Sequence, residues 1–458
     1  MKTILINKIL SKQFIINLIL FFIVFLFSIQ TNPSLIPKTS PDSSGYVSVS
    51  KDFTNYISNI RPFFFPLIIR VSYFISNDSW QIVFSLFQLT LHSMMVVLLF
   101  RSFKLYNLSS SSSFLCSILI GFNPSLLYYS TYVLADFILA ILTTLSWFFL
   151  LRLNFQKDSY FKYAILSSVF SGLCIVTKPI ALLMIVPIIF AVFFLNNCSK
   201  KVLKISILMI LLNFSFHFSW IQFKNSFVLN SEYEQSSILW GGLNMTAIRG
   251  GLIKYGEGTK LYSVIEEEGM LEKAKNMKIK MSYTMDTESD YIDIYKALSK
   301  YTGMEKVKLM NDEEFAMKVI KKAPIPLFYY AISNWHSFFT KRSFNPSFPK
   351  MPKFLKKLYD YVFAILYRPL LLLLLMVSFF QMFLNKNFRL MIISLSIILY
   401  SSLIISILTP HGGEFPRYRI WIEYIMWFCA LIPVGLLMDK IVFMYNKNHL
   451  KLLISSWK

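Results

Sequence analysis

The sequence predicts an all-α integral membrane protein with about ten transmembrane helices, and three observations point to this class. Of its 458 residues, 55% are hydrophobic and only 15% are charged, whereas a soluble protein carries about 25% charged residues. The apolar residues cluster in runs of about 18 or more, which is the length that a helix needs to cross a bilayer. Lys and Arg bound these runs and gather in alternate loops, as they do at the cytoplasmic face of membrane proteins.

About ten apolar runs qualify as spans, with ends defined to within about two to four residues. They cover residues 13–30, 81–100, 112–129, 135–151, 161–177, 179–196, 203–220, 361–384, 389–408 and 419–438. The first run is expected to remain as a span, because it is long and no A-x-A cleavage pattern follows it. Three parts result: an N-terminal transmembrane module at 1–220 with a first outer loop at 31–80, an outer segment at 221–360, and C-terminal transmembrane helices at 361–458.

Clusters of Lys and Arg mark every second loop and both tails. They are Lys2, Lys8 and Lys12; Arg101 and Lys104; Arg152, Lys157 and Lys162; Lys200, Lys201 and Lys204; Lys386 and Arg389; and Lys440, Lys447, Lys451 and Lys458. By the positive-inside rule this side is cytoplasmic, and both termini lie there. The net charge of +22 is thus spread over loops and span ends, where it meets anionic lipid headgroups. We expect no nucleic-acid partner.

The opposite, non-cytoplasmic side then carries the long polar segments. Two of their stretches are expected to form helices in the plane of the membrane interface. Residues 62–75 are apolar but too short to span and carry Arg70, and residues 326–339 are amphipathic and rich in aromatic side chains. A third stretch, residues 265–297, mixes acidic and basic side chains in a helix-like pattern. If either interfacial stretch did span, the agreement among the positive loops would be lost.

The cysteines lie in or at the edge of apolar runs, and none has the spacing of a zinc site. They are Cys116, Cys174, Cys198 and Cys429. The long polar segment contains no cysteine, so the sequence predicts neither a disulfide scaffold nor a metal site there. Their expected role is that of small buried thiols in helices, and no cofactor is evident.

The first outer loop holds the most informative polar residues, PDSSGYVSVSKDFTNYISNIRP. Asp42 lies shortly after the first span, where a carboxylate near the bilayer surface can take a proton from an acceptor hydroxyl. Tyr46 follows it, and Arg61 precedes the interfacial stretch, where a guanidinium can hold a phosphate with paired donors. Asp42 in Pro-Asp-Ser-Ser also has the pattern of a helix start. The residues alone leave both interpretations of Asp42 open.

Two further outer positions carry a charge beside apolar runs. Asp136 lies between two such runs near the outer surface, where an ionisable residue is costly and indicates function. The alternative is an exposed cap at the start of the fourth span. Lys178 lies in a tight outer turn between two spans, against the positive-inside bias, and it can bind a lipid-linked phosphate or reach up to the headgroups.

The last outer loop and the span after it, HGGEFPRYRIWIEY at 411–424, form the fourth such position. Arg417 and Arg419 are cations on the less favoured side and indicate an anion site. His411, Glu414 and Glu423 are close to them in sequence, but a lone histidine is more often a bystander than a ligand. Four separated outer loops therefore each place a carboxylate or a cation at one membrane face. A site for an anionic, lipid-anchored substrate explains this pattern.

These motifs, in their order and sidedness, resemble a known family. They are Asp42-Ser43-Ser44-Gly45-Tyr46, Arg61-Pro62 to Pro66, Asn123-Pro124 with Ala135-Asp136, Thr177-Lys178-Pro179, residues 311–328, and Arg417-Tyr418-Arg419. The chain resembles bacterial members of the GT-C superfamily of polyprenyl-phosphate-dependent glycosyltransferases. That superfamily includes the protein O-mannosyltransferases and the aminoarabinose transferase of lipid A. The resemblance covers most of the chain, although each motif is weak alone.

The resemblance implies a direct, inverting displacement at the anomeric carbon of a sugar. An acidic residue of the first outer loop is the general base in the family, and by position this is Asp42. The second acidic position falls on Asp136, where it would hold the acceptor or a metal; family members often have Glu there. Asp42 is followed by Ser43, whereas many relatives carry a paired acidic motif. The residues therefore give no support for a divalent metal, and the sequence leaves metal dependence open.

The resemblance also implies which cations bind the lipid phosphate, whose charge grows as it leaves. Arg61, Lys178 and Arg417 fall at these positions, and Tyr46 and Arg419 complete the predicted substrate-binding set. Relatives often carry Arg where this chain has Lys178. A lysine offers a point charge rather than a paired grip on phosphate.

The leading hypothesis is a hexosyl- or pentosyltransferase of the bacterial cytoplasmic membrane with its active site on the outer face. It would move a sugar from a polyprenyl-phosphate donor to a glycan, lipid or protein acceptor. One alternative is an O-antigen-type polysaccharide polymerase, which would not need Asp42 after the first span. Another is a flippase for lipid-linked oligosaccharides or another transporter, which should show charged or broken helices at the bilayer midplane and two related halves. The sequence shows few midplane charges and no repeat.

Overall fold

The computed structural model is built from helices, and its described residues contain no strand, only an isolated bridge between Lys38 and Tyr132. The structure describes residues 2–52, 62–155, 160–195, 200–227, 238–276, 298–301, 303–333, 335–340, 348–384, 388–408 and 415–456. The prediction of an all-helical fold is confirmed for these residues.

The helices follow one another in three groups. The first group is α1 (Lys2–Thr31), α2 (Pro41–Lys51), α3 (Phe64–Ile75), α4 (Trp80–Leu105), α5 (Ser110–Gly121), α6 (Pro124–Tyr129), α7 (Ala135–Phe155), α8 (Tyr160–Thr177), the 3-10 helix η3 (Pro179–Met184), α9 (Ile185–Leu195) and α10 (Lys200–Phe227). The second is α11 (Ile238–Arg249), η4 (Ile253–Gly256), α12 (Lys260–Glu267), α13 (Leu271–Lys275), η5 (Leu298–Lys300), α15 (Gly303–Met310), α16 (Glu313–Lys322), α17 (Pro324–Ser333) and α18 (Trp335–Thr340). The third is α19 (Lys353–Ile365), the π-helical turn η6 (Leu366–Leu370), α20 (Leu371–Leu384), α21 (Phe388–Leu408) and α22 (Phe415–Ser456).

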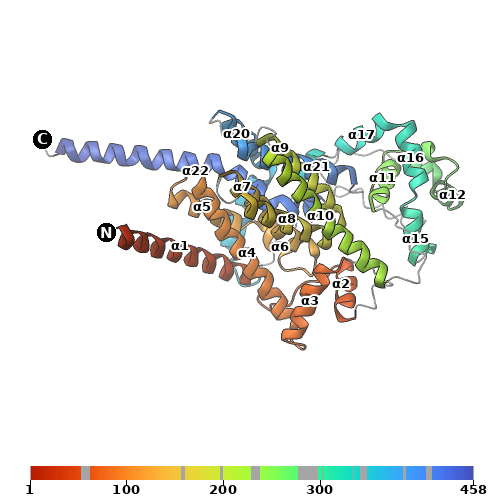
Figure 1. Ribbon diagram of the computed structural model, residues 1–458, viewed down its shortest axis with the longest axis horizontal. Coiled ribbons are helices and arrows are strands. Elements are labelled where there is room, and N and C mark those ends of the chain that lie inside the picture. Colours follow the sequence, from red (N-terminus) through yellow and green to blue (C-terminus); the bar gives the residue numbers. More distant parts are fainter. Residues whose placement is uncertain are drawn as a thin grey trace.

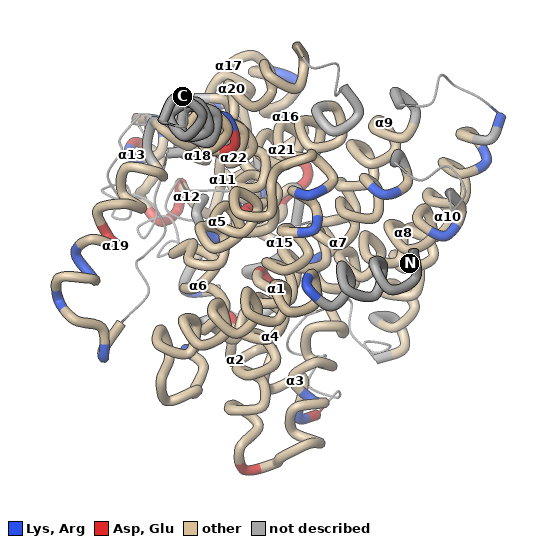
Figure 2. Tube along the Cα trace, turned by 90° about the vertical axis from the view of Figure 1, so that its left-hand side faces the viewer, with Lys and Arg blue, Asp and Glu red and all other residues tan. Residues whose placement is uncertain are grey.

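Both ends of the chain lie at the same end of the molecule (Figure 1). Helices α11, α12, α15 and α16 lie at the opposite end, and α2 and α3 also lie away from the termini (Figure 1). Figure 2 looks at the molecule from the end that carries the termini, where Lys and Arg lie at the ends of several helices. This end corresponds to the side of the membrane that the sequence predicts to be cytoplasmic.

Among the described residues, five helices are long and apolar enough to cross a membrane. They lie at Lys12–Thr31, Trp80–Leu105, Ala135–Leu153, Val202–Phe223 and Arg417–Tyr445. Shorter apolar helices of 10–17 residues accompany them, α3, α5 and α20 among them. These helices support a multi-pass membrane protein, and the count of about ten spans stays a prediction.

One expected span is interrupted within the described residues. The expected span at 112–129 ends at Gly121 and begins again at Pro124, because the residue before a proline disfavours the helical conformation. Asn123 instead caps α6, and its side chain accepts a hydrogen bond from the Leu126 N–H at 3.1 Å. The stretch at 326–339, expected to be an interfacial helix, falls on α17 and α18, and residue 334 between them lies outside the described residues.

Helix α7 and the first part of α22, up to about Ile432, form the centre of the bundle and are mostly buried, whereas α1 and α10 expose most of their apolar surface. Helices α8 and α20 pack against these two central helices. A helix surrounded by protein can carry charged side chains at much lower cost than one facing lipid. Among the described residues, the buried acidic and arginine side chains Asp136, Arg419 and Glu423 lie on α7 and α22.

The second group of helices has a small core of its own. Ile248, Ile253 and Leu261 pack there with Phe315 and Val319, separately from the core of the bundle. Residues 221–360 were predicted to form one outer segment, and the separate core lies within this range. The exact boundaries of the three parts stay predictions.

Candidate functional site

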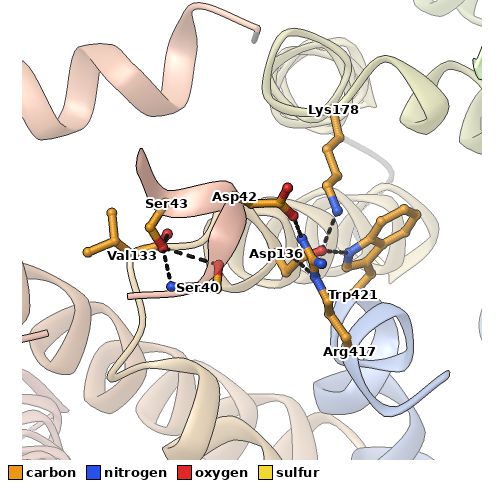
Figure 3. Close-up of polar contacts among 8 residues, drawn as sticks. All are labelled: Ser40, Asp42, Ser43, Val133, Asp136, Lys178, Arg417 and Trp421. Carbon is orange, nitrogen blue, oxygen red and sulfur yellow. Dashed lines mark hydrogen bonds and ion pairs between the residues drawn. The ribbon is translucent and has the colours of Figure 1, made fainter. Parts of the chain in front are cut away.

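Charged side chains from four distant parts of the sequence meet at one place (Figure 3). Arg417 donates hydrogen bonds to both carboxylates, from Nη2 to Asp42 Oδ2 at 2.5 Å and from Nε to Asp136 Oδ2 at 3.1 Å. Lys178 Nζ donates to the other oxygen of Asp136, Oδ1, at 2.5 Å. We call Asp42, Asp136, Lys178 and Arg417, with Trp421, the outer cluster. The sequence predicted four of these five residues as site residues from different loops.

Hydrogen bonds to residues 131–133 hold Asp42 in place. Ser43 Oγ accepts from the Ser40 N–H and donates to the Val133 carbonyl, both at 2.8 Å. The Lys38 N–H donates to the Thr131 carbonyl at 2.7 Å, and the Lys38 carbonyl accepts from the Val133 N–H at 3.0 Å. Because α7 begins at Ala135, these bonds bring the first turn of α2 beside the first turn of α7. Ser40, and not Asp42, is the N-cap of α2, so the alternative that Asp42 caps the helix is wrong; Asp42 lies in the first turn and faces the cluster.

Asp136 is fully buried, and every partner it has in the cluster is a hydrogen-bond donor. Besides Lys178 and Arg417, the indole N–H of Trp421 donates to Oδ1 at 3.0 Å. A buried carboxylate without such partners would be very costly. Asp136 is therefore not the exposed helix cap that the sequence left open, but the anchor on which both cations are held.

Lys178 lies at the break between α8 and η3, where Pro179 starts the 3-10 helix. Its ammonium lies over two aromatic rings, at 4.8 Å from the Tyr418 centroid and 5.0 Å from the Trp421 centroid. Such cation–π contacts fix a cation without neutralising it. The Lys178 side chain is 16% exposed and that of Arg417 19%, so neither side chain is completely buried.

The outer cluster lies at the amino ends of three helices. Asp42, Asp136 and Arg417 occupy the first turns of α2, α7 and α22. The amino end of a helix carries about half a positive charge and exposes unpaired N–H groups, which favours bound anions. The formal charges of two carboxylates and two cations cancel, so the helix ends leave the cluster with a positive bias. The arrangement suits a ligand with a phosphate or another anionic group.

A second polar cluster lies two residues further along α22. Arg419 and Glu423 are fully buried, with Arg419 Nε donating to Glu423 Oε2 at 2.8 Å. Trp427 Nε1 donates to Glu423 Oε1 at 2.9 Å. Tyr367 Oη lies 2.6 Å from both Glu423 Oε1 and Asn123 Oδ1, and its single proton bonds one of these oxygens at a time. Asn123 completes the group. We call these five residues the inner cluster.

The other predicted site residues lie elsewhere or outside the described residues. Arg419 belongs to the inner cluster and not to the outer one. Tyr46 is buried in the core, with its ring edge against Phe65 at 4.9 Å. Arg61, His411 and Glu414 lie outside the described residues.

Trp421 was not singled out from the sequence. It follows Arg417 by four residues, and residues at this spacing share one face of a helix. The spacing alone could therefore have placed Trp421 beside Arg417. Lys178 and its aromatic neighbour Tyr418 carry no such local signal, because they are far apart in the sequence.

No group of three or more His, Cys, Asp and Glu side chains that could hold a metal ion occurs among the described residues. Asp136, the residue that the family resemblance associates with a metal, faces two cations and an indole N–H. This set of donors favours a negative group between them and disfavours a divalent cation. The residues around Asp136 therefore do not fit a metal site.

Comparison with known proteins shows a distant likeness to a solved structure. No protein-family model matches the chain, and no curated protein sequence matches it. The chain is similar to the crystal structure of ArnT from Cupriavidus metallidurans in the apo state, with 13% identity and a TM-score of 0.34 over 91% of this chain and 78% of that chain. ArnT is a GT-C lipid A aminoarabinose transferase, the kind of enzyme that the sequence motifs resemble. Because identity and TM-score are low, the likeness carries no argument about activity.

Proposed function

We propose that this chain is a membrane glycosyltransferase that moves a sugar from a polyprenyl-phosphate donor to an acceptor hydroxyl at the non-cytoplasmic face. One observation carries the proposal: a partly exposed carboxylate, Asp42, is paired with a partly exposed arginine, Arg417, in the outer cluster. A base and a phosphate-binding cation thereby lie within one hydrogen bond of each other. A transfer that removes a proton from a hydroxyl and releases a phosphate needs both groups.

The Asp42–Arg417 pair also suggests how the base is activated. An aspartate held by an arginine is a weak base, because the cation stabilises its ionised form. A donor phosphate that binds between Arg417 and Lys178 competes with Asp42 for the guanidinium. Asp136 keeps both cations in place, since it bonds each of them through a different oxygen. Donor binding would thus release Asp42 to accept a proton from the acceptor.

In the proposed reaction, the acceptor hydroxyl oxygen forms a bond to the anomeric carbon, and Asp42 takes the hydroxyl proton. The bond between the anomeric carbon and the phosphate oxygen breaks, and the electron pair leaves with the polyprenyl phosphate. Negative charge grows on that phosphate in the transition state, where Arg417, Lys178 and the helix amino ends stabilise it. Attack opposite to the leaving group inverts the anomeric configuration.

The position of the cluster fits a substrate anchored in the membrane. Asp136 and Arg417 lie at the ends of apolar helices that are long enough to cross a bilayer. Aromatic side chains, Tyr418 and Trp421, flank the cations, as is typical of the interface between lipid and water. A phosphate at the head of a polyprenyl chain can therefore reach Arg417 and Lys178 while its tail stays in the bilayer.

The test is a transfer assay with purified protein in detergent and a panel of polyprenyl-phosphate sugars. We expect one donor to be consumed, with release of polyprenyl phosphate. Asp42→Asn should lower the rate constant by about 10²–10⁴-fold, the usual contribution of a general base. Asp52→Asn, at the other end of α2, is the matched control and should retain the wild-type rate.

The result is interpretable only if both variants insert and remain folded, which size-exclusion chromatography and thermal melting check. Transfer at nearly the wild-type rate by Asp42→Asn would remove Asp42 as the base. Failure of every polyprenyl-phosphate sugar, with intact wild-type protein, would reject the proposed donor class.

A further inference from the structure

A cavity of about 380 Å³ lies on the side of α2 that faces away from Asp42. The chain before α2, α2 itself, the end of α3 and the start of α4 enclose it. Its polar and aromatic lining consists mainly of Thr39, Ser44, Lys51, Tyr73, Trp80 and Gln81. Pockets for small ligands usually measure about 300–1,000 Å³. The cavity is therefore large enough for a small molecule and too small for a polyprenyl chain or a lipid tail.

Helical spacing separates this cavity from the outer cluster. Ser40, Ser44, Val47 and Lys51 line the cavity and recur at intervals of three or four residues, which places them on one face of α2. Asp42 lies on the other face and points toward Arg417, whereas Ser40 lies on the opposite side of the helix (Figure 3). A ligand in the cavity would thus be separated from the proposed base by the width of one helix.

The lining is neutral for the most part and combines two kinds of contact. The rings of Tyr73 and Trp80 stack on each other with centroids 4.6 Å apart and an angle of 26°, and they provide apolar surface. Thr39, Ser44 and Gln81 provide hydroxyl and amide groups that both donate and accept hydrogen bonds. A sugar ring presents the matching surfaces, with C–H groups on its faces and hydroxyl groups around its edge.

Tyr73 borders the cavity through its aromatic ring. Its hydroxyl is buried and has no hydrogen-bond partner among the residues that the structure describes. Because this hydroxyl is buried, a ligand in the cavity would contact the ring of Tyr73 and not its hydroxyl. Lys51, whose ammonium lies 5.7 Å from the centroid of the Tyr73 ring and which is exposed, stands at the edge of the same cavity.

We propose that this cavity is a saccharide-binding subsite, which holds a sugar unit of the acceptor glycan that does not itself react. The inference rests on the proposed glycosyl transfer and adds the class of acceptor to it, namely a carbohydrate chain. Lys51 is the one cation that the described residues contribute to the lining, whereas a phosphate or nucleotide ligand usually takes several paired donors. Lys51 would add affinity for sugars with an acidic substituent, such as a uronic acid.

The test measures binding directly and does not depend on transfer. Methyl glycosides of glucose, galactose, mannose, N-acetylglucosamine and glucuronic acid are titrated into the purified full chain in nanodiscs, and saturation-transfer NMR reports binding. We expect at least one to bind. Tyr73→Leu and Trp80→Leu each remove one ring of the stacked pair and should each weaken binding up to about tenfold, whereas Tyr73→Phe keeps the ring and should bind as the wild type does. Lys51→Gln should weaken only the glucuronide.

Two controls keep this inference separate from the proposed reaction. Asp42→Asn should bind the glycosides as the wild type does, because Asp42 faces the other side of α2, even if it no longer transfers sugar. Tyr361→Leu, which removes an exposed tyrosine ring of α19, should also leave binding unchanged. If no glycoside binds, or if Tyr73→Leu and Trp80→Leu bind as the wild type does, the subsite is rejected. If binding is lost in Asp42→Asn, the saccharide binds at the outer cluster instead. Should Trp80→Leu fail to fold, Tyr73→Leu decides alone.

Discussion

The first turns of α22 carry two arginine–carboxylate clusters that differ in what surrounds them. In the outer cluster, Arg417 pairs with Asp42, and these side chains are 19% and 32% exposed. In the inner cluster, Arg419 pairs with Glu423, and both side chains are fully buried. Residues two apart on a helix point about 200° apart, so one short sequence serves both clusters.

The partners of the two arginines show why one cluster suits catalysis and the other suits stability. Arg417 is held by carboxylates from two other helices and keeps part of its surface exposed. Arg419 is held by Glu423 of the same helix, α22. It also contacts the Phe338 carbonyl at 2.8 Å and the ring of Tyr367 at 5.1 Å. A ligand can displace a partner of Arg417, whereas a ligand has no access to Arg419. The sidedness of charge therefore does not suffice to assign a function; exposure must be added to it.

Loss of Glu423 should produce the largest effect on stability. Glu423→Ala leaves the Arg419 guanidinium buried without its carboxylate, and breaking one partner of a buried ion pair costs about 3–5 kcal/mol. We expect a large drop in the midpoint of thermal unfolding in detergent, or failure to accumulate in the membrane. Glu272→Ala removes an exposed carboxylate that pairs with Lys275 and should change the midpoint little. A wild-type midpoint in Glu423→Ala would show that the inner cluster does not stabilise the bundle.

The sequence predicted the all-helical membrane class, because long apolar runs are a local signal. It did not predict the break at Asn123 inside the expected span 112–129. Pro124 indicates a break, but the apolar residues on both sides of it favoured one continuous span. The structure shows what makes the break tolerable: Asn123 caps α6 and also accepts from Tyr367 far along the chain. A tertiary contact of this kind has no signature in local periodicity.

The candidate site was predictable in part for a similar reason. Asp42, Asp136, Lys178 and Arg417 share one predicted side of the membrane, and the structure brings them together. The same criterion also selected Arg419, since sidedness does not separate neighbours that face opposite ways around a helix. The cavity beside α2 was not predicted, because its lining comes from segments that are distant in sequence and mostly uncharged.

The next effect in size concerns Arg417. Arg417→Ala removes the guanidinium that we place on the donor phosphate, and we expect the KM for the polyprenyl-phosphate sugar to rise about ten- to hundredfold, or about 1.4–2.8 kcal/mol. Hydrogen bonds to charged groups contribute about this much. Arg417→Lys keeps the charge but not the paired donors, so its donor KM should fall between that of the wild type and that of Arg417→Ala. Steady-state kinetics with varied donor concentration give the KM of each variant.

Lys275→Ala is the matched control for loss of a cation, because Lys275 lies in the outer segment and pairs only with Glu272 among the ion pairs of the described residues. Its donor KM should equal that of the wild type. An unchanged donor KM in Arg417→Ala would exclude Arg417 from phosphate binding, whatever its effect on stability. A change that appeared equally in Lys275→Ala would instead indicate a general effect of surface charge.

The smallest effect should come from Tyr367→Phe, and it tests whether the two clusters are independent. The Tyr367 hydroxyl lies 2.6 Å from Glu423 Oε1, 2.6 Å from Asn123 Oδ1 and 2.7 Å from Ser125 Oγ. When this hydroxyl is removed, Glu423 still has its hydrogen bonds from Arg419 and Trp427. We expect a loss of about 1 kcal/mol, seen as a small fall in the melting midpoint, with an unchanged donor KM. Arg417 and Arg419 share one helix, so a shift of the donor KM in Tyr367→Phe would mean that the inner cluster positions Arg417 and that α22 couples the two. Unchanged kinetics with lowered stability would instead assign the inner cluster to stability alone.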